Sequence, residues 1–143
     1  MYEPYLALQV VMMPRDANPN PSVLPGWGPY PLYSTIFGGI LLSYIDQAGA
    51  LGARREVARA GGPLPMLVTV AVNRVEFKQP VLVGDVVRFL TRLVRLGRTS
   101  ITMQVSVEAE RGRDVLPVTE AEIVYVGIDS TSPDRRPKPL LPE

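Results

Sequence analysis

The spacing of hydrophobic positions changes from a helix period to a strand period once along this chain. An apolar stretch with a helix period covers residues 38–60, and the Gly-Gly-Pro sequence at 61–63 ends it. Before it, the apolar run at 5–13 predicts a first strand. After it, a period of two predicts four more strands, at about residues 67–77, 86–96, 100–108 and 115–128.

These elements predict an α+β fold. Short turns join the last four strands, which indicates an antiparallel meander, and one long helix packs on it. The first half of that helix is apolar nearly all round, which is typical of a buried helix. One helix cannot cover both faces of a five-stranded sheet, and such a sheet keeps unpaired edges. We therefore expect a dimer or a larger assembly.

Two proline-rich segments interrupt this pattern. The first, over residues 14–35, is long for a loop in a compact domain, and such loops are usually functional or disordered. Trp27, Tyr30 and Tyr33 lie in it and argue against plain disorder, so that a lid, a tunnel lining and an interface arm are all open interpretations. The second, from residue 129 on, predicts an extended or disordered tail.

The composition indicates one ordinary globular domain. The chain has 143 residues, of which 46% are hydrophobic and 20% charged, with a net charge of +1. So small a net charge gives no reason to expect nucleic acid or a membrane as a partner. No apolar run reaches the roughly 18 residues of a membrane span, and no signal peptide is visible. We expect a cytoplasmic protein.

Histidine and cysteine are both absent. Their absence excludes Ser-His-Asp and Cys-His mechanisms, thiolate chemistry, disulfides and imidazole zinc sites. Any catalysis must then use carboxylates, amides, hydroxyls, backbone dipoles or a bound cofactor.

The start of the predicted helix carries the clearest candidate chemistry. Gly38 and Gly39 let a ligand approach the free N–H groups of the first helical turn. Asp46 is the one carboxylate in an otherwise apolar half of the helix, where an acidic side chain costs stability unless it is paired or used. Together they suggest a site that polarises a carbonyl and activates water. The alternative for Asp46 is a buried, merely hydrogen-bonded or interface residue.

An ordered set of short motifs resembles the hotdog-fold acyl-CoA thioesterases. The matching residues are 13–18 (Met-Pro-Arg-Asp-Ala-Asn), 37–39 (Phe-Gly-Gly), 46–49 (Asp-Gln-Ala-Gly), 68–72, 77, 80, 83–87, 97–100 and 121–126. The resemblance implies a hotdog domain at 1–128, in which a five-stranded antiparallel sheet wraps a long central helix, followed by the tail at 129–143. The chain departs from the family by a proline-rich insertion at about 19–34.

The resemblance also implies roles for individual residues. Asp46 matches the family's carboxylate, which either activates water as a general base or attacks the thioester directly. Gly39 would offer its N–H to the thioester oxygen, and Asn18, or Asn20 in its place, would orient the water or bind that oxygen. The structural alternatives are close packing for Gly39 and a turn before Pro19 for Asn18.

The remaining implied residues would bind the substrate. Phe37 and Gly38 stand beside the oxyanion position, while Arg98, Thr99 and Ser100 match the hairpin that holds the CoA pantetheine and phosphates. A solvated turn is the alternative for that hairpin. We expect acyl-CoA as the substrate, and neither a cofactor nor a metal.

The spacing within the helix adds a constraint. Gly39 and Asp46 are seven residues apart, which separates them by roughly 10 Å along a helix axis. One thioester carbon cannot lie about 3 Å from both. We therefore expect two antiparallel helices across a two-fold axis, with Gly39 of one subunit facing Asp46 of the other. A homodimer is the minimal unit; a trimer of dimers is the favoured assembly and a tetramer the alternative.

Three other functions compete with thioester hydrolysis. A non-catalytic acyl-CoA binding or sensing protein would keep the CoA surface, but would not need Asp46. A hotdog dehydratase or hydratase generally employs a histidine, which this chain lacks. A purely structural oligomer would leave the glycine pair and Asp46 unexplained.

Overall fold

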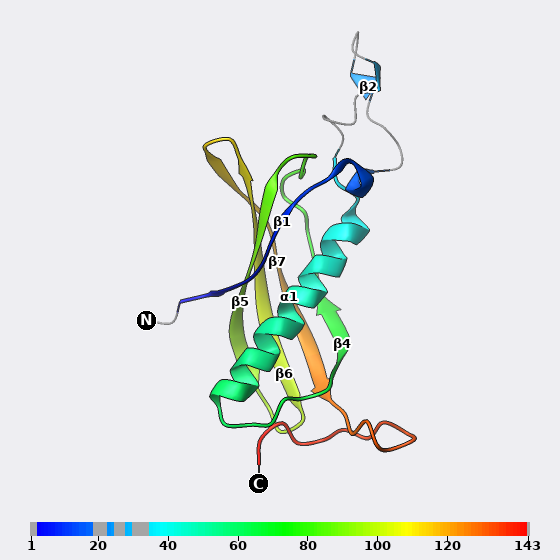
Figure 1. Ribbon diagram of the computed structural model, residues 1–143, viewed down its shortest axis with the longest axis vertical. Helices are drawn as coiled ribbons and strands as arrows, with labels where there is room; N and C mark the ends of the chain where they lie inside the picture. Colours follow the sequence, from blue (N-terminus) through cyan, green and yellow to red (C-terminus); the bar gives the residue numbers. More distant parts are fainter. Residues whose placement is uncertain (1–2, 19–22, 25–27, 30–34, 143) are drawn as a thin grey trace.

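The computed structural model describes residues 3–18, 23–24, 28–29 and 35–142. In these residues one long helix, α1 (Gly38–Arg59), lies across a five-stranded antiparallel sheet of order β1-β5-β6-β7-β4 (Figure 1). This arrangement confirms the α+β hotdog fold expected from the resemblance. The strands of the sheet are β1 (Tyr5–Val11), β4 (Leu67–Asn73), β5 (Val86–Leu96), β6 (Ser100–Arg111) and β7 (Asp114–Gly127).

The predicted four-strand meander is wrong in one respect. β5, β6 and β7 do follow one another through tight turns, but β4 pairs with the far side of β7 and not with β5. The connection over residues 74–85 is long enough to carry the chain across the end of the sheet. Hydrophobic alternation identifies a strand without saying which neighbour it joins, so this crossover is visible only in the fold.

The core lies between α1 and the inner face of the sheet. β6 alternates buried and half-buried residues along its length, as its sequence period predicts. On the helix, Gly49 and Gly52 allow a close approach, since a side chain at either position would collide with Tyr125 or Thr91. Leu42 and Leu51 are 41% and 39% exposed. The prediction that the first half of the helix is buried is therefore wrong at Leu42 within one chain.

Short segments gather at the start of α1. The 3-10 helix η1 (Pro14–Asp16) follows β1, while β2 (Val23–Leu24) and β3 (Gly28–Pro29) form a separate two-stranded pairing. The described residues do not include Trp27, Tyr30, Tyr33 or Asn20. The three interpretations of the aromatic residues, as a lid, a tunnel lining or an interface arm, therefore remain predictions.

The stretch after β7 folds back onto the other end of the molecule (Figure 1). The Lys138 N–H donates to the Gly127 carbonyl at 2.8 Å, and the Leu140 N–H donates to the Arg98 carbonyl at 3.0 Å. Leu140 is only 2% exposed. This stretch thus forms a wall beside the last turn of α1.

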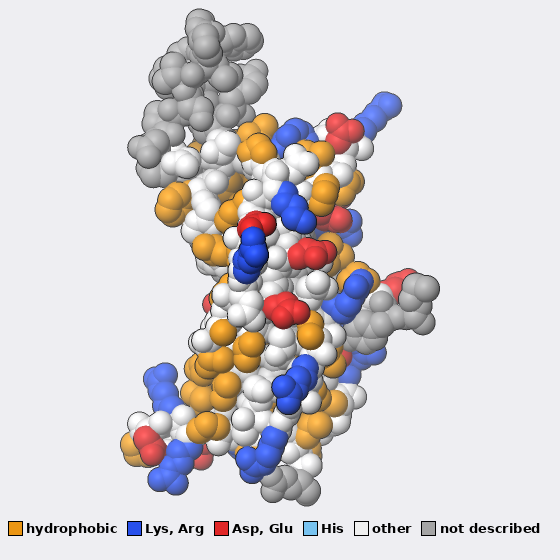
Figure 2. Space-filling model, turned by 180° about the vertical axis from the view of Figure 1, so that it is seen from behind, with side chains coloured by type: hydrophobic (Ala, Val, Ile, Leu, Met, Phe, Trp, Pro, Cys, Tyr) orange, Lys and Arg blue, Asp and Glu red, His pale blue; other side chains and the backbone are white. Residues whose placement is uncertain are grey.

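The sheet has two edges, β1 and β4. Val70 and Val72 of β4 are 55% and 45% exposed. Seen from the sheet side, hydrophobic side chains gather along the side of the molecule where β4 lies (Figure 2). Among the described residues, no helix has the length and apolarity needed to cross a bilayer.

Candidate active site

Asp46 lies two turns into α1, on the side of the helix that faces β4. Its carboxylate is half-buried, and the hydroxyl of Thr69 donates a 2.7 Å hydrogen bond to Oδ1. The Tyr125 hydroxyl also interacts with this carboxylate. The carboxylate is therefore held in one orientation.

Tyr125 of β7 binds the same turn of the helix from the sheet. Its hydroxyl donates a 2.7 Å hydrogen bond to the main-chain carbonyl of Asp46, and Thr69 is its register partner on β4. Burial raises the pKa of Tyr125 far above its usual range, and the negative charge of Asp46 raises it further. The phenol therefore stays a donor at any physiological pH.

The start of α1 is an exposed glycine pair flanked by two aromatic rings. Phe37 is 47% exposed, and its ring lies so close to Gly39 that a Cβ there would be 2.8 Å from it. The ring of Phe77 lies on the Gly38 side, 3.5 Å from where a Cβ of Gly38 would be. The N–H groups of Gly38 and Gly39 have no acceptor inside the helix, and the helix dipole adds positive potential there. The geometry suits a carbonyl oxygen that gains negative charge.

Three segments fix this helix start in place. The Phe37 N–H donates to the Asp16 carbonyl at 3.0 Å, the Ile36 N–H to the Val81 carbonyl at 2.7 Å, and the Asn18 N–H to the Thr35 carbonyl at 2.8 Å. Asn18, predicted for the site, is thereby brought to the same end of α1 as the glycine pair.

A buried ion pair stabilises the loop behind it. Asp85 is 3% exposed and receives two hydrogen bonds from the Arg111 guanidinium, at 3.0 and 2.8 Å. The Asp85 carboxylate also accepts the Leu82 N–H at 2.9 Å, and the interaction with Asp85 raises the pKa of Arg111. The loop that supports the helix start is therefore rigid.

The predicted residues form three separate groups within one chain. Asn18, Phe37, Gly38 and Gly39 lie at the start of α1, and Asp46 lies about 10 Å further along the axis. Arg98, Thr99 and Ser100 lie at the β5–β6 turn, at the opposite end of the molecule (Figure 1). The backbone of this turn accepts hydrogen bonds from Gly127 at Thr99 and from Leu140 at Arg98.

Two residues of the site were missed by sequence reasoning. Thr69 and Tyr125 both interrupt strands of β-branched apolar residues with a side chain that carries a hydroxyl. Such a substitution at a core-facing or helix-facing position is a signal for a hydrogen bond between elements. The signal was too weak to use because the register of β4 against β7 and α1 is fixed only by the fold.

Known proteins of similar sequence cover nearly the whole chain. The family model described as the thioesterase superfamily matches residues 33–116. The acyl-CoA thioester hydrolase YciA of Salmonella typhimurium is 35% identical over 140 residues, which is 94% of this chain and 89% of that protein. YciA of Escherichia coli K12 is 33% identical over 140 residues, with the same two coverages.

Solved structures share the fold over the same length. The hexameric thioesterase y2039 from Yersinia pestis superposes with a TM-score of 0.76 at 31% identity, covering 100% of this chain and 99% of its own. HI0827, a hexameric broad-specificity acyl-coenzyme A thioesterase, superposes with a TM-score of 0.76 at 29% identity, covering 100% and 85%. HI0827 was also solved as a variant with one aspartate changed to alanine, at a TM-score of 0.76, 28% identity and coverages of 99% and 89%.

Proposed function

Because the chain belongs to the thioesterase superfamily, with acyl-CoA thioester hydrolases as full-length relatives, we propose that it hydrolyses acyl-CoA to a free fatty acid and CoA. One observation carries the proposal. The chain has neither histidine nor cysteine, and α1 carries a half-buried carboxylate that Thr69 of β4 orients. The start of the same helix offers free N–H groups. Thioester hydrolysis needs these two groups, a base or nucleophile and an oxyanion site.

Asp46 supplies the proton-accepting or nucleophilic group. In one route the carboxylate takes a proton from a water molecule as that water attacks the thioester carbon; the tetrahedral intermediate then breaks its C–S bond, and the departing CoA thiolate takes up the proton. In the other, the carboxylate attacks the carbon and expels the CoA thiolate, and water then hydrolyses the resulting mixed anhydride to the fatty acid and the free carboxylate. Both routes use the orientation imposed by Thr69 at Oδ1.

Gly39 supplies the oxyanion donor. As the thioester carbon becomes tetrahedral, its oxygen gains charge beside the Gly39 N–H and the positive end of the α1 dipole. One such donor lowers the barrier by about 2.7–4 kcal/mol. Asn18 lies at the same end of the helix, where its amide would orient the water or share the thioester oxygen.

The active unit is a dimer with two shared sites. Gly39 and Asp46 of one chain are too far apart to act on one carbon, whereas two antiparallel helices bring Gly39 of one chain to Asp46 of the other. The exposed Val70 and Val72 on the β4 edge, and Leu42 on α1, support a second copy packed on this side.

An antiparallel dimer also explains the third group of residues. It would bring the Arg98–Thr99–Ser100 turn of one chain toward the helix start of its partner. The pantetheine and phosphates of the bound CoA would extend out of the site at this point. Phe37 and Gly38 would line that exit. Both hexameric relatives support a trimer of such dimers. Since CoA esters are made and consumed inside cells, we place the enzyme in the cytoplasm.

The direct test measures thiol release from a panel of acyl-CoAs by the wild type and by Asp46→Asn. General base catalysis contributes about 10²–10⁴-fold, so Asp46→Asn should lose activity by that factor while folding normally. Asp114→Asn, at the exposed first residue of β7, is the matched control and should keep wild-type activity. Full activity in Asp46→Asn would contradict the site. Binding of acyl-CoA without any thiol release by the wild type would favour the sensing protein.

A further inference from the structure

The chain after β7 folds back on itself as residues 128–142, which we call the tail strap (Figure 1). It reverses direction, because the Asp129 N–H donates to the Arg136 carbonyl at 2.8 Å and Ile128 forms an antiparallel bridge with Pro137. This reversal returns the last residues of the tail strap to the end of β7.

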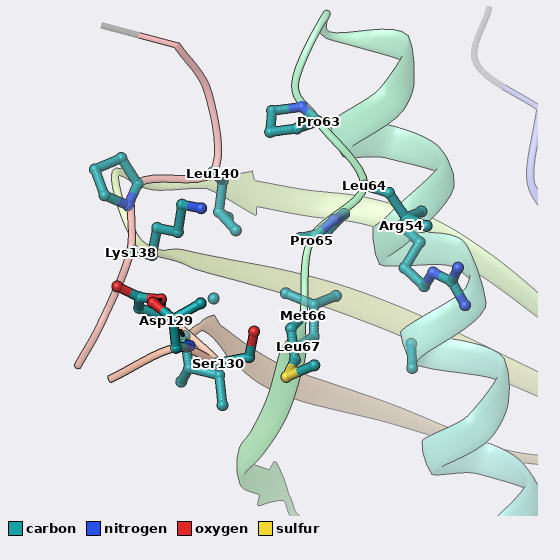
Figure 3. Close-up of a pocket in the computed structure, with 15 residues that line it drawn as sticks. Arg54, Pro63, Leu64, Pro65, Met66, Leu67, Asp129, Ser130, Lys138 and Leu140 are labelled. Atoms are coloured by element: carbon teal, nitrogen blue, oxygen red, sulfur yellow. Dashed lines mark hydrogen bonds between the residues drawn. The ribbon is translucent and has the colours of Figure 1, made fainter. Parts of the chain in front are cut away.

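Leu140 anchors the tail strap by close packing. Its side chain is 2% exposed and belongs to the hydrophobic core. Two glycines make room for it: a Cβ at Gly127 would lie 2.6 Å from Leu140 Cδ2, and a Cβ at Gly62 would lie 2.4 Å from the Leu140 carbonyl oxygen. Figure 3 shows Leu140 on the strap, on one side of a pocket whose opposite side carries Pro65. The tail strap is therefore clamped between the end of β7 and the residues that follow α1.

The tail strap also reaches the turn between β5 and β6. The Leu140 N–H donates to the Arg98 carbonyl at 3.0 Å, and the Gly127 N–H donates to the Thr99 carbonyl at 2.8 Å. The Ser100 carbonyl accepts a 2.8 Å hydrogen bond from within the turn itself. Of these three hydrogen bonds, only the one to Arg98 comes from the strap. The backbone of Arg98 therefore depends on Leu140 for its restraint from outside the hairpin.

We propose that Leu140 is a positioning residue for CoA binding: by anchoring the tail strap, it fixes the backbone of Arg98 in the conformation that receives the CoA phosphates. The inference rests on the proposed thioesterase function, which places the phosphates at this turn. Contacts between a guanidinium group and a phosphate are directional. A turn that is ordered before the ligand arrives also loses less conformational freedom on binding.

This role predicts a change in binding without a change in the chemical step. Leu140→Ala keeps the N–H but opens a cavity that loosens the strap. We expect KM for acyl-CoA and Kd for CoA to rise about tenfold, because the phosphate contacts weaken with the turn. The reacting carbon lies at the other end of the CoA arm, so kcat should change less than about twofold.

Acyl-pantetheine separates positioning from general damage to the fold. It carries the same thioester and pantetheine arm as acyl-CoA but has neither the nucleotide nor the phosphates. Its KM should be the same for Leu140→Ala and the wild type. Leu140→Met, which fills most of the same space, should restore the wild-type KM for acyl-CoA. Leu140→Val makes a smaller cavity and should show a smaller rise in KM, and it serves the same test if the alanine variant does not fold.

Val107→Ala is the matched control. Val107 is 2% exposed, as Leu140 is, but it lies near the other end of β6, away from the turn. This variant loses core packing and should keep the wild-type KM for both substrates. Thermal unfolding and the oligomer mass of each variant confirm the fold.

Three results would overturn the proposal. The first is an unchanged KM for acyl-CoA in folded Leu140→Ala and Leu140→Val. The second is an equal rise for acyl-CoA and acyl-pantetheine, and the third is the same rise in Val107→Ala. Failure of the wild type to hydrolyse any acyl-CoA would instead contradict the proposed function. The Kd values of CoA and pantetheine, measured on the wild type and Leu140→Ala, would still decide whether the tail strap positions the turn.

Discussion

At the scale of single residues, the site depends on Asp46 and on the two hydroxyls that fix its turn. Thr69 binds the carboxylate itself, and Tyr125 binds the main-chain carbonyl of the same residue. Neither hydroxyl touches the substrate in the proposed mechanism, so both are positioning residues. A carboxylate that is already oriented loses less conformational freedom on the way to the transition state.

Thr69→Val should therefore lower kcat about tenfold to a hundredfold and leave KM for acyl-CoA nearly unchanged. The variant keeps the shape and β-branching of threonine but removes its hydrogen bond to Oδ1. Steady-state kinetics with separate kcat and KM values check it. Thr69→Ser retains the hydroxyl and should restore most of kcat. Equal activity in the valine and serine variants would show that the hydroxyl has no role.

At the scale of elements, the contact of α1 with the sheet depends on small residues opposite large ones. Gly49 leaves room for the Tyr125 hydroxyl, which would collide with any Cβ at that position. This close contact brings the Asp46 carbonyl within reach of Tyr125. The contact with the sheet thus determines the position of Asp46, the proposed catalytic residue.

Gly49→Ala should destabilise the protein by about 1–3 kcal/mol, because the added methyl group overpacks the contact. Replacing the phenol with a smaller ring should relieve part of this. We expect the double variant Gly49→Ala/Tyr125→Phe to be more stable than the sum of the two single effects predicts. Urea unfolding of the four proteins measures the coupling. Strict additivity would mean that the hydroxyl and the methyl group do not compete for the same space.

Much of the fold could be predicted from the sequence, and the exceptions have physical causes. The helix and the hairpins of β5, β6 and β7 follow from local periodicity and turn residues, as does the α+β class. The partner of β4 could not be predicted, since a connection as long as residues 74–85 permits several crossovers. Asp46 and the glycine pair could be identified from the sequence because a carboxylate in an apolar helix face and two glycines at a helix start are both unfavourable for helix stability. Thr69 and Tyr125 did not, because their importance comes from contacts between elements distant in sequence.

At the scale of the whole molecule, the proposed mechanism divides each active site between two chains. Gly39 and Asp46 are separated by about 10 Å along α1, and the exposed Leu42 lies one turn from Asp46 on the same face of the helix. The first half of α1, which the sequence predicts to be buried, is exposed at Leu42 within one chain. We attribute this difference to the second copy that the proposed dimer supplies.

Subunit complementation tests this shared site most directly. Gly39→Val would place a branched side chain over the oxyanion position on an exposed first turn, and Asp46→Asn would remove the base. Each variant alone should be nearly inactive. When the two differently tagged chains are co-expressed, half of the dimers are mixed and each mixed dimer has one intact site. About half of the dimers in hexamers isolated through both tags are still mixed, so these hexamers should recover about a quarter of wild-type activity. Recovery no greater than that of the two parent variants, in oligomers shown to contain both chains, would contradict a site shared between subunits.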